Sequence, residues 1–308
     1  MEKKVFKMLK DVNYIDVRDK YTRYYTYFLK IGESEMTEKD FKVIKKFLRE
    51  RALKEKNLIS YEGFSGVNFK SLRKNSTQQI FKDVKKLVED FDCKIILVLR
   101  EQSSFITSHY KRYICRGGYK DIYNFIEDEI DLPNHNYYNY VKGLEKVFGR
   151  GNIYLLLYEN FPSNDTTGIK AKTIRALLDF IGEKDMPELD SSANPDSKIS
   201  KLMNRTINKG YEDLQIRISR TINPGFRSGF NPKGIIPVLP IPTFSGLRFK
   251  FIPELILKNR FFEAMSTKYE MPKELRRKIK RYYLEGNKRL GQEYGLNLPD
   301  AYLKIDQK

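Results

Sequence analysis

Apolar residues in the N-terminal part of the chain follow two alternating patterns. The segments 94–99 and 152–157 are nearly continuous apolar runs, which are typical of parallel strands covered on both faces. Other segments repeat apolar residues at helical spacing. One such helix is expected from Ser76, with the inward-facing residues Ile80, Val84, Leu87, Val88 and Phe91. Strand-like and helix-like segments alternate at least four times, which predicts an α/β fold with a parallel sheet flanked by helices.

Further elements follow from the same criteria. Short strands are expected over 12–16 and 57–61, and a helix is expected over 169–181. Thr37 precedes an acidic turn, as a helix N-cap does, and Gly149 occupies the kind of position at which a helix ends.

The C-terminal part has a different character. Residues 198–222 are expected to be helical, whereas 224–253 are rich in proline, glycine and aromatic residues. A basic helix is expected over 272–294, with the inward-facing residues Leu275, Ile279, Tyr282, Tyr283 and Leu290. We expect a single domain, with an α/β core over 1–190 and a mostly helical elaboration over 191–308.

The composition narrows the classes of function. Lys and Arg number 58 against 40 Asp and Glu, and the resulting net charge of +18 favours anionic partners without choosing among them. With two cysteines and two histidines, neither a disulfide framework nor a zinc site with spaced ligands can be built. No metal cofactor is therefore expected. Cys93 opens an apolar run and is expected to be a small buried residue.

Targeting and membrane signals are weak. No apolar core of a signal peptide follows Met1, and the longest apolar runs are too short to span a membrane, so a cytoplasmic protein is expected. Three interpretations stay open for the stretch 225–253, which contains the apolar run 234–242: a lid over the substrate, a loop that makes peripheral membrane contact, and plain packing over the sheet. Packing is favoured, because the run is short and interrupted by proline.

Polar residues follow three of the expected strands. Glu62, Arg100 and Glu159 each come shortly after a strand, and ligands of open parallel sheets bind beyond the carboxyl ends of the strands. An arginine at such an edge presents a rigid fork that suits a phosphate group. A structural partnership of Arg100 with a carboxylate is the alternative. Ser108, eight residues after Arg100, adds a hydroxyl on the next helix, which is expected from about Ser103.

The segment 94–113 resembles the 3′-phosphate-binding segment of sulfotransferases that use 3′-phosphoadenosine 5′-phosphosulfate (PAPS). In that family a strand ends in arginine and a serine follows eight residues later, as Arg100 and Ser108 do. The resemblance implies that these two residues hold the 3′-phosphate of PAPS, the sulfate-donating cosubstrate, whose product is adenosine 3′,5′-bisphosphate. It also implies the P-loop NTPase-like sulfotransferase fold.

Other stretches resemble the family in the same order along the chain. Residues 58–65 are similar to the strand and loop that carry an active-site glutamate in carbohydrate and bacterial members, which implies that Glu62 is the catalytic base. Residues 148–159 resemble the family strand that ends in Tyr-Glu, and 282–290 resemble the Asn-x-x-Leu helix of bacterial members. Glu159 itself is interpreted as a structural hydrogen-bonding residue.

One departure from the family pattern is large. The family places a 5′-phosphosulfate loop, a Lys-x-Gly-Thr-Thr-like turn, ahead of all these segments, and the sequence from Met1 does not contain it. A start codon assigned too late, a fragment and a degenerate member are the alternatives. A truncated reading frame is favoured, because the remaining segments keep their spacing.

These observations lead to two hypotheses of different class. The first is a sulfotransferase that acts on a hydroxyl group of a carbohydrate or glycolipid. The alternative is a non-catalytic or degenerate basic α/β domain that binds a nucleotide or polyanion. Nucleic acid is not expected as a partner, because basic and aromatic residues are not interleaved as in a nucleic-acid platform. A kinase would need a glycine-rich phosphate loop that the sequence lacks.

Overall fold

The computed structural model describes residues 11–15, 17, 24–65, 70, 75–115, 120–161, 169–183 and 269–305. The helix expected at 198–222 and the segments 224–253 and 234–242 lie outside these described residues. The chain divides into two compact units. The first unit contains the described residues up to Gln102, those from Asp131 to Glu183 and those from Lys280 onward, and the second contains Ser103–Ile130 and Tyr269–Ile279.

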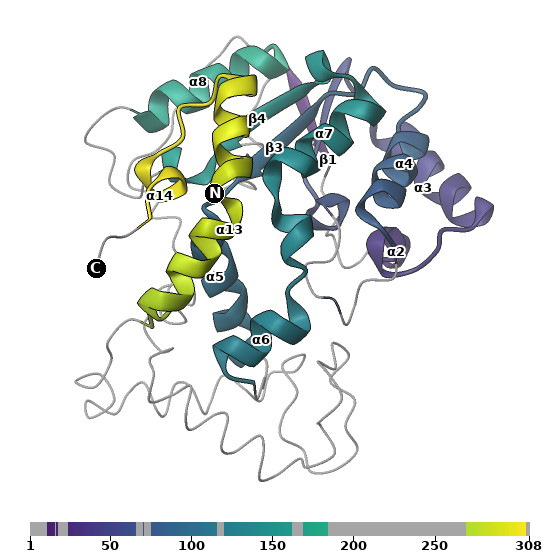
Figure 1. Ribbon diagram of the computed structural model, residues 1–308. Helices are drawn as coiled ribbons and strands as arrows, with labels where there is room; N and C mark the ends of the chain where they lie inside the picture. Colours follow the sequence, from purple (N-terminus) through teal and green to yellow (C-terminus); the bar gives the residue numbers. More distant parts are fainter. Residues whose placement is uncertain are drawn as a thin grey trace, which may run out of the picture. The chain divides into compact units, whose positions relative to one another are not determined.

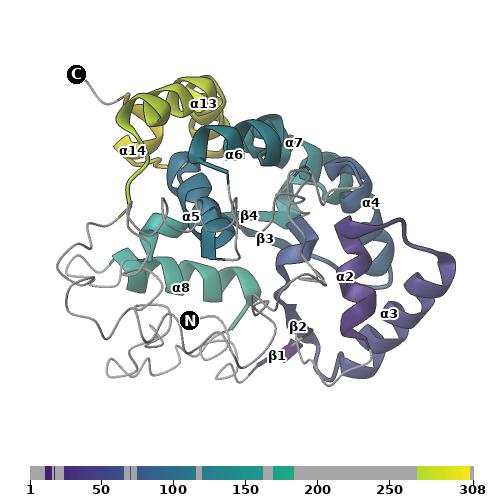
Figure 2. The same cartoon turned by 90° about the horizontal axis from the view of Figure 1, so that it is seen from below.

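The first unit contains two pairs of parallel strands. β1 (Val12–Ile15) pairs with β2 (Lys56–Ile59), and β3 (Ile95–Leu99) pairs with β4 (Ile153–Leu157) (Figures 1 and 2). All four strands lie within the segments expected to form strands, apart from one residue at the start of β2. The prediction of an α/β fold with parallel strands flanked by helices is confirmed at this level.

Helices occupy most of the remaining described chain. Their bounds are α2 (Tyr25–Glu33), α3 (Glu38–Arg51), α4 (Thr77–Leu87), α5 (Gln102–Cys115), α6 (Ile122–Glu129), α7 (Tyr137–Phe148), α8 (Ile169–Ile181), α13 (Lys273–Tyr294) and α14 (Asp300–Leu303). Short 3-10 turns are η1 (Glu62–Ser65), η3 (Leu132–His135), η4 (Arg150–Asn152) and η5 (Tyr158–Asn160). Among the helices of the described residues, none is long and apolar enough to cross a membrane.

The helix ends have the chemistry that the sequence predicts. At the start of α3, the Thr37 hydroxyl accepts a hydrogen bond from the Asp40 N–H, and the Asp40 carboxylate accepts one from the Thr37 N–H, at 3.3 and 2.9 Å. At the start of α4, the Ser76 hydroxyl accepts a hydrogen bond from the Gln79 N–H at 3.2 Å. Gly149 follows α7 with φ of 82°, a left-handed conformation that favours glycine.

Helices pack against both faces of the strand pairs. Ile15 of β1 and Ile153 of β4 pack with α2, α3, α4 and α7, and these first three helices lie together on one flank of the unit (Figures 1 and 2). Val12 packs with α8, and Tyr154 stacks on Phe180 of α8 at 4.7 Å. Because neighbouring strand residues point to opposite faces, α8 covers the face opposite the main core.

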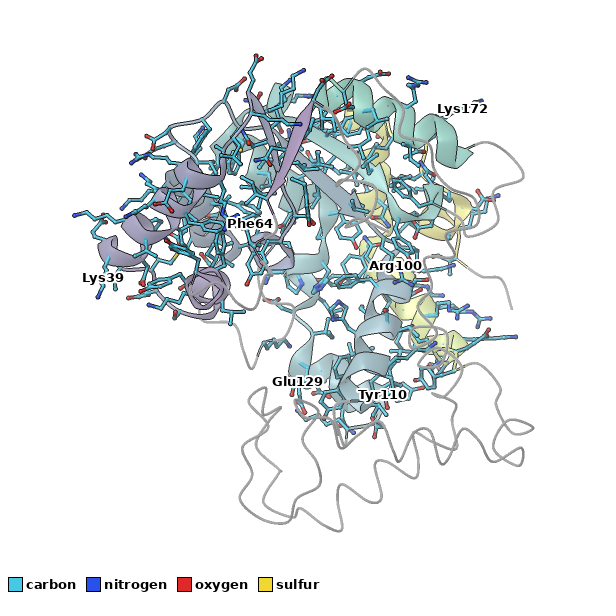
Figure 3. All side chains as sticks on the ribbon, turned by 180° about the vertical axis from the view of Figure 1, so that it is seen from behind. Lys39, Phe64, Arg100, Tyr110, Glu129 and Lys172 are labelled. Carbon is cyan, nitrogen blue, oxygen red and sulfur yellow. The ribbon has the colours of Figure 1, made fainter. Side chains whose placement is uncertain are left out.

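The described residues of the second unit include the main part of α5, α6 and the start of α13. Tyr110 and Tyr113 of α5 pack against Phe125 of α6, with ring centroids 5.2 and 4.9 Å apart. Lys120 forms an ion pair with the buried Glu129 carboxylate at 2.6 Å. Tyr110 and Glu129 are labelled in Figure 3.

Three expectations about burial are wrong. Phe91 lies beyond the end of α4 and is 36% exposed, so the apolar stripe stops at the helix end. Val98 is 48% exposed, so burial does not extend along the whole of β3. Tyr282 is 50% exposed because it lies about 100° around α13 from Tyr283, which takes the inward position.

Candidate functional site

The carboxyl ends of β3 and β4 bring together the main candidate residue and an aromatic partner. The paired strands end at Leu99 and Leu157, and Arg100 and Tyr158 are the residues that directly follow them. The Arg100 guanidinium carbon lies 4.6 Å from the centroid of the Tyr158 ring, and Tyr158 is 51% exposed. Figure 3 labels Arg100 at this edge. The strand pairing therefore places an arginine on an aromatic face at the edge where ligands of parallel sheets bind.

The positive charge of Arg100 is available to a ligand. Within the described part of the chain, no carboxylate forms an ion pair with its guanidinium, and the stack on Tyr158 is its side-chain contact. The described residues therefore do not support the alternative interpretation, in which Arg100 anchors a structural carboxylate. A half-buried guanidinium that keeps its N–H groups for a ligand suits a phosphate or sulfate group.

The backbone after β3 is held by side chains. The Tyr137 hydroxyl donates a hydrogen bond to the carbonyl oxygen of Arg100 at 2.6 Å, and the N–H of Glu101 donates one to Glu159 Oε1 at 2.9 Å. Burial raises the pKa of the Tyr137 hydroxyl well above its ordinary value, more than the Arg100 carbonyl contact lowers it. Tyr137 therefore stays protonated and donates at neutral pH.

Two C-terminal helices complete these contacts. The side-chain amides of Gln102 and Asn287 of α13 bond to each other in both directions, at 2.8 and 3.2 Å. Asn287 also donates to the Tyr302 carbonyl oxygen at 3.1 Å, and the Tyr302 hydroxyl donates to Glu159 Oε2 at 2.8 Å. Burial, and next the negative charge of Glu159, raise the pKa of Tyr302 far above its usual range. The interpretation of Glu159 as a structural hydrogen-bonding residue is confirmed.

The other two site residues predicted from the sequence stay predictions. Glu62 is the first residue of η1, and Ser60 and Tyr61 separate this turn from the end of β2 at Ile59. Aromatic packing holds this turn, because the ring centroid of Phe28 lies 5.8 Å from that of Tyr61 and 6.2 Å from that of Phe64. Ser108 is an exposed residue of α5 in the second unit, whereas Arg100 belongs to the first.

The helix that carries Ser108 begins one residue before its expected start at about Ser103. Ser103 lies inside α5, which begins at Gln102, and its carbonyl oxygen accepts a bond from the Thr107 hydroxyl at 2.7 Å. The His109 ring packs on the Phe105 ring of the same helix, with ring centroids 4.3 Å apart.

Thiol and metal chemistry find no support in the described residues. Cys93 is half-buried, and burial raises the pKa of its thiol, which disfavours the reactive thiolate. Searched over the described ranges, His, Cys, Asp and Glu form no group of three or more able to hold a metal ion.

Sequence reasoning missed the aromatic and C-terminal partners of the site. Tyr158 was detectable in principle, since it follows its strand as Arg100 follows the neighbouring one. Asn287 lies in the segment that resembles the family helix, but nothing local to it indicates Gln102 as its partner.

The chain has little similarity to known proteins. No protein-family model matches the chain, and no curated protein matches it. The crystal structure of a sulfotransferase from Alicyclobacillus acidocaldarius aligns with 71% of this chain and 88% of its own, with a TM-score of 0.41 and 11% sequence identity. A likeness this distant does not assign a function.

Proposed function

We propose that this chain is a sulfotransferase that transfers the sulfuryl group of PAPS to a hydroxyl group of a carbohydrate or glycolipid. The observation that carries the proposal is Arg100, an ion-pair-free guanidinium within the described residues, stacked on Tyr158 at the carboxyl end of a parallel strand. The segments that resemble the sulfotransferase family in sequence supply this strand, the η1 turn and the helix that bonds to Gln102.

Each residue has a distinct role in the proposed reaction. Arg100 and Ser108 hold the 3′-phosphate of the donor, and Glu62 accepts the proton of the acceptor hydroxyl. The acceptor oxygen forms a new bond to sulfur while the bond from sulfur to the bridging oxygen breaks. Adenosine 3′,5′-bisphosphate leaves with the electron pair of that bond. Such a displacement is accelerated mainly by positioning the reactants and stabilising the developing charge. The protein is therefore expected to contribute a preorganised cation, the Arg100 guanidinium, that holds PAPS in place.

The choice of acceptor depends on Glu62. A glutamate as the proposed base, and the similarity of the C-terminal helix to bacterial members, favour a carbohydrate or glycolipid over other alcohols. This preference is an analogy with the family and needs a direct test of acceptors.

Calorimetric titration with adenosine 3′,5′-bisphosphate tests the donor site. The parent protein should bind and Arg100→Ala should lose measurable binding. Arg150→Ala is a matched control, because Arg150 also stacks on a tyrosine, Tyr294, at 5.0 Å, in the same unit. Binding that survives Arg100→Ala, or that falls equally in Arg150→Ala, would remove the phosphate site from Arg100.

Turnover separates an enzyme from a binding domain. Transfer of labelled sulfate from PAPS to a panel of oligosaccharides and glycolipids should be detected for the parent protein. Glu62→Gln should abolish transfer while leaving bisphosphate binding unchanged. Binding without transfer to any acceptor would favour the non-catalytic alternative.

A further inference from the structure

The direction of the Arg100 side chain depends on its backbone. In the described part of the chain its guanidinium contacts the Tyr158 ring and no carboxylate. With no ion pair to orient it, the guanidinium takes its direction from the peptide that carries it and from the ring beneath. Any freedom of that peptide would have to be removed when an anion binds.

That peptide is held at three consecutive residues. The Arg100 carbonyl accepts a bond from Tyr137, the Glu101 N–H donates to Glu159, and the Gln102 side chain pairs with Asn287. Each contact fixes a different group of the segment that leads from β3 into α5.

The contacts also form a closed circuit. From Glu101 the bonds run to Glu159, then to Tyr302, then to Asn287, and finally to Gln102, which is covalently joined to Glu101. The circuit joins β3 to η5, α14 and α13, which come together from positions up to 185 residues apart. Hydrogen bonds in such buried networks support one another, so the loss of one member loosens the others.

We propose that Tyr137, Glu159, Asn287 and Tyr302 are positioning residues that preorganise Arg100 for a phosphate group. None of them is required to touch the ligand. The inference rests on the proposed function, because it assigns these residues to the same donor site. It also makes the C-terminal helices α13 and α14 functional parts of that site.

The competing explanation is that these bonds only stabilise the fold. Three variants that each remove a single hydroxyl separate the two explanations. Tyr137→Phe and Tyr302→Phe act within the network. Tyr283→Phe is the matched control, because buried Tyr283 of α13 donates to the Leu132 carbonyl oxygen at 2.9 Å, outside the network.

Calorimetric titration with adenosine 3′,5′-bisphosphate and the melting temperature are measured for each variant. All three should lose similar stability, because each loses one part-buried hydrogen bond. Tyr137→Phe and Tyr302→Phe should weaken binding about fivefold or more, and Tyr283→Phe less than about twofold. The positioning role is wrong if affinity for the bisphosphate falls in proportion to melting temperature in all three variants. It is also wrong if affinity changes in none of them.

A second measurement tests whether the effect passes through Arg100. In an Arg100→Lys background, Tyr137→Phe should weaken binding less than it does in the parent protein, because the oriented guanidinium is already gone. Equal effects in both backgrounds would overturn the inference. If the parent protein itself fails to bind the bisphosphate, the proposed function falls and this inference falls with it. If only this inference fails, the parent protein still binds the bisphosphate and Arg100→Ala still does not.

Discussion

Replacement of Arg100 by lysine is the sharpest test of how the proposed site holds a phosphate group. Lysine keeps the positive charge, but it loses the planar fork that makes two parallel hydrogen bonds. It also stacks less well on Tyr158, which lies 4.6 Å from the guanidinium carbon of Arg100. If only charge matters, the substitution should have little effect.

The expected magnitude follows from these two losses. One charge-assisted hydrogen bond contributes about 1.5 to 3 kcal/mol, and a cation–π contact at a partly exposed ring about 0.5 to 1 kcal/mol. Lysine retains part of the second contribution. Arg100→Lys should therefore weaken binding of adenosine 3′,5′-bisphosphate by about 2 kcal/mol, or roughly thirtyfold in Kd.

Isothermal titration calorimetry at two salt concentrations provides the measurement. Arg100→Lys should keep the salt dependence of the parent protein, whereas Arg100→Ala should reduce it, because only alanine removes the charge. Arg150→Lys, at the Tyr294 stack, should change Kd less than about twofold. Parent-like affinity in Arg100→Lys would show that the guanidinium fork does not hold the phosphate.

Two further predictions concern stability. Leu290 is 0% exposed and packs with Leu99 and Leu157. Leu290→Ala should therefore lower the free energy of unfolding by about 3 kcal/mol, measured with urea at an unchanged m-value. A loss below about 1 kcal/mol would contradict this packing. Burial raises the pKa of Asp40, but Lys30 at 2.5 Å and the Thr37 bonds outweigh it and lower that pKa below its ordinary value. A lowered folded-state pKa adds stability above the unfolded pKa of about 3.9 and loses it as pH falls through the folded pKa. Asp40→Asn should therefore lose more stability at pH 7 than at pH 3, and an equal loss at both would refute the linkage.

Local patterns in the sequence determined the elements of this protein. The continuous apolar runs predicted β3 and β4, and Thr37 predicted the start of α3. The same patterns placed Arg100 directly after one strand and Glu159 two residues after the end of another. These features depend on residues within a few positions of one another, so the sequence alone specifies them.

Tertiary structure decided which of these residues work together. It placed Tyr158 under Arg100, exposed Tyr282, and paired Gln102 with Asn287 across 185 residues. Every asparagine has the same hydrogen-bonding groups as any other asparagine, and the same is true among glutamines and among tyrosines. Composition and spacing therefore do not choose the partners. The choice is made when helices and strands pack, because packing decides which polar groups are buried at bonding distance.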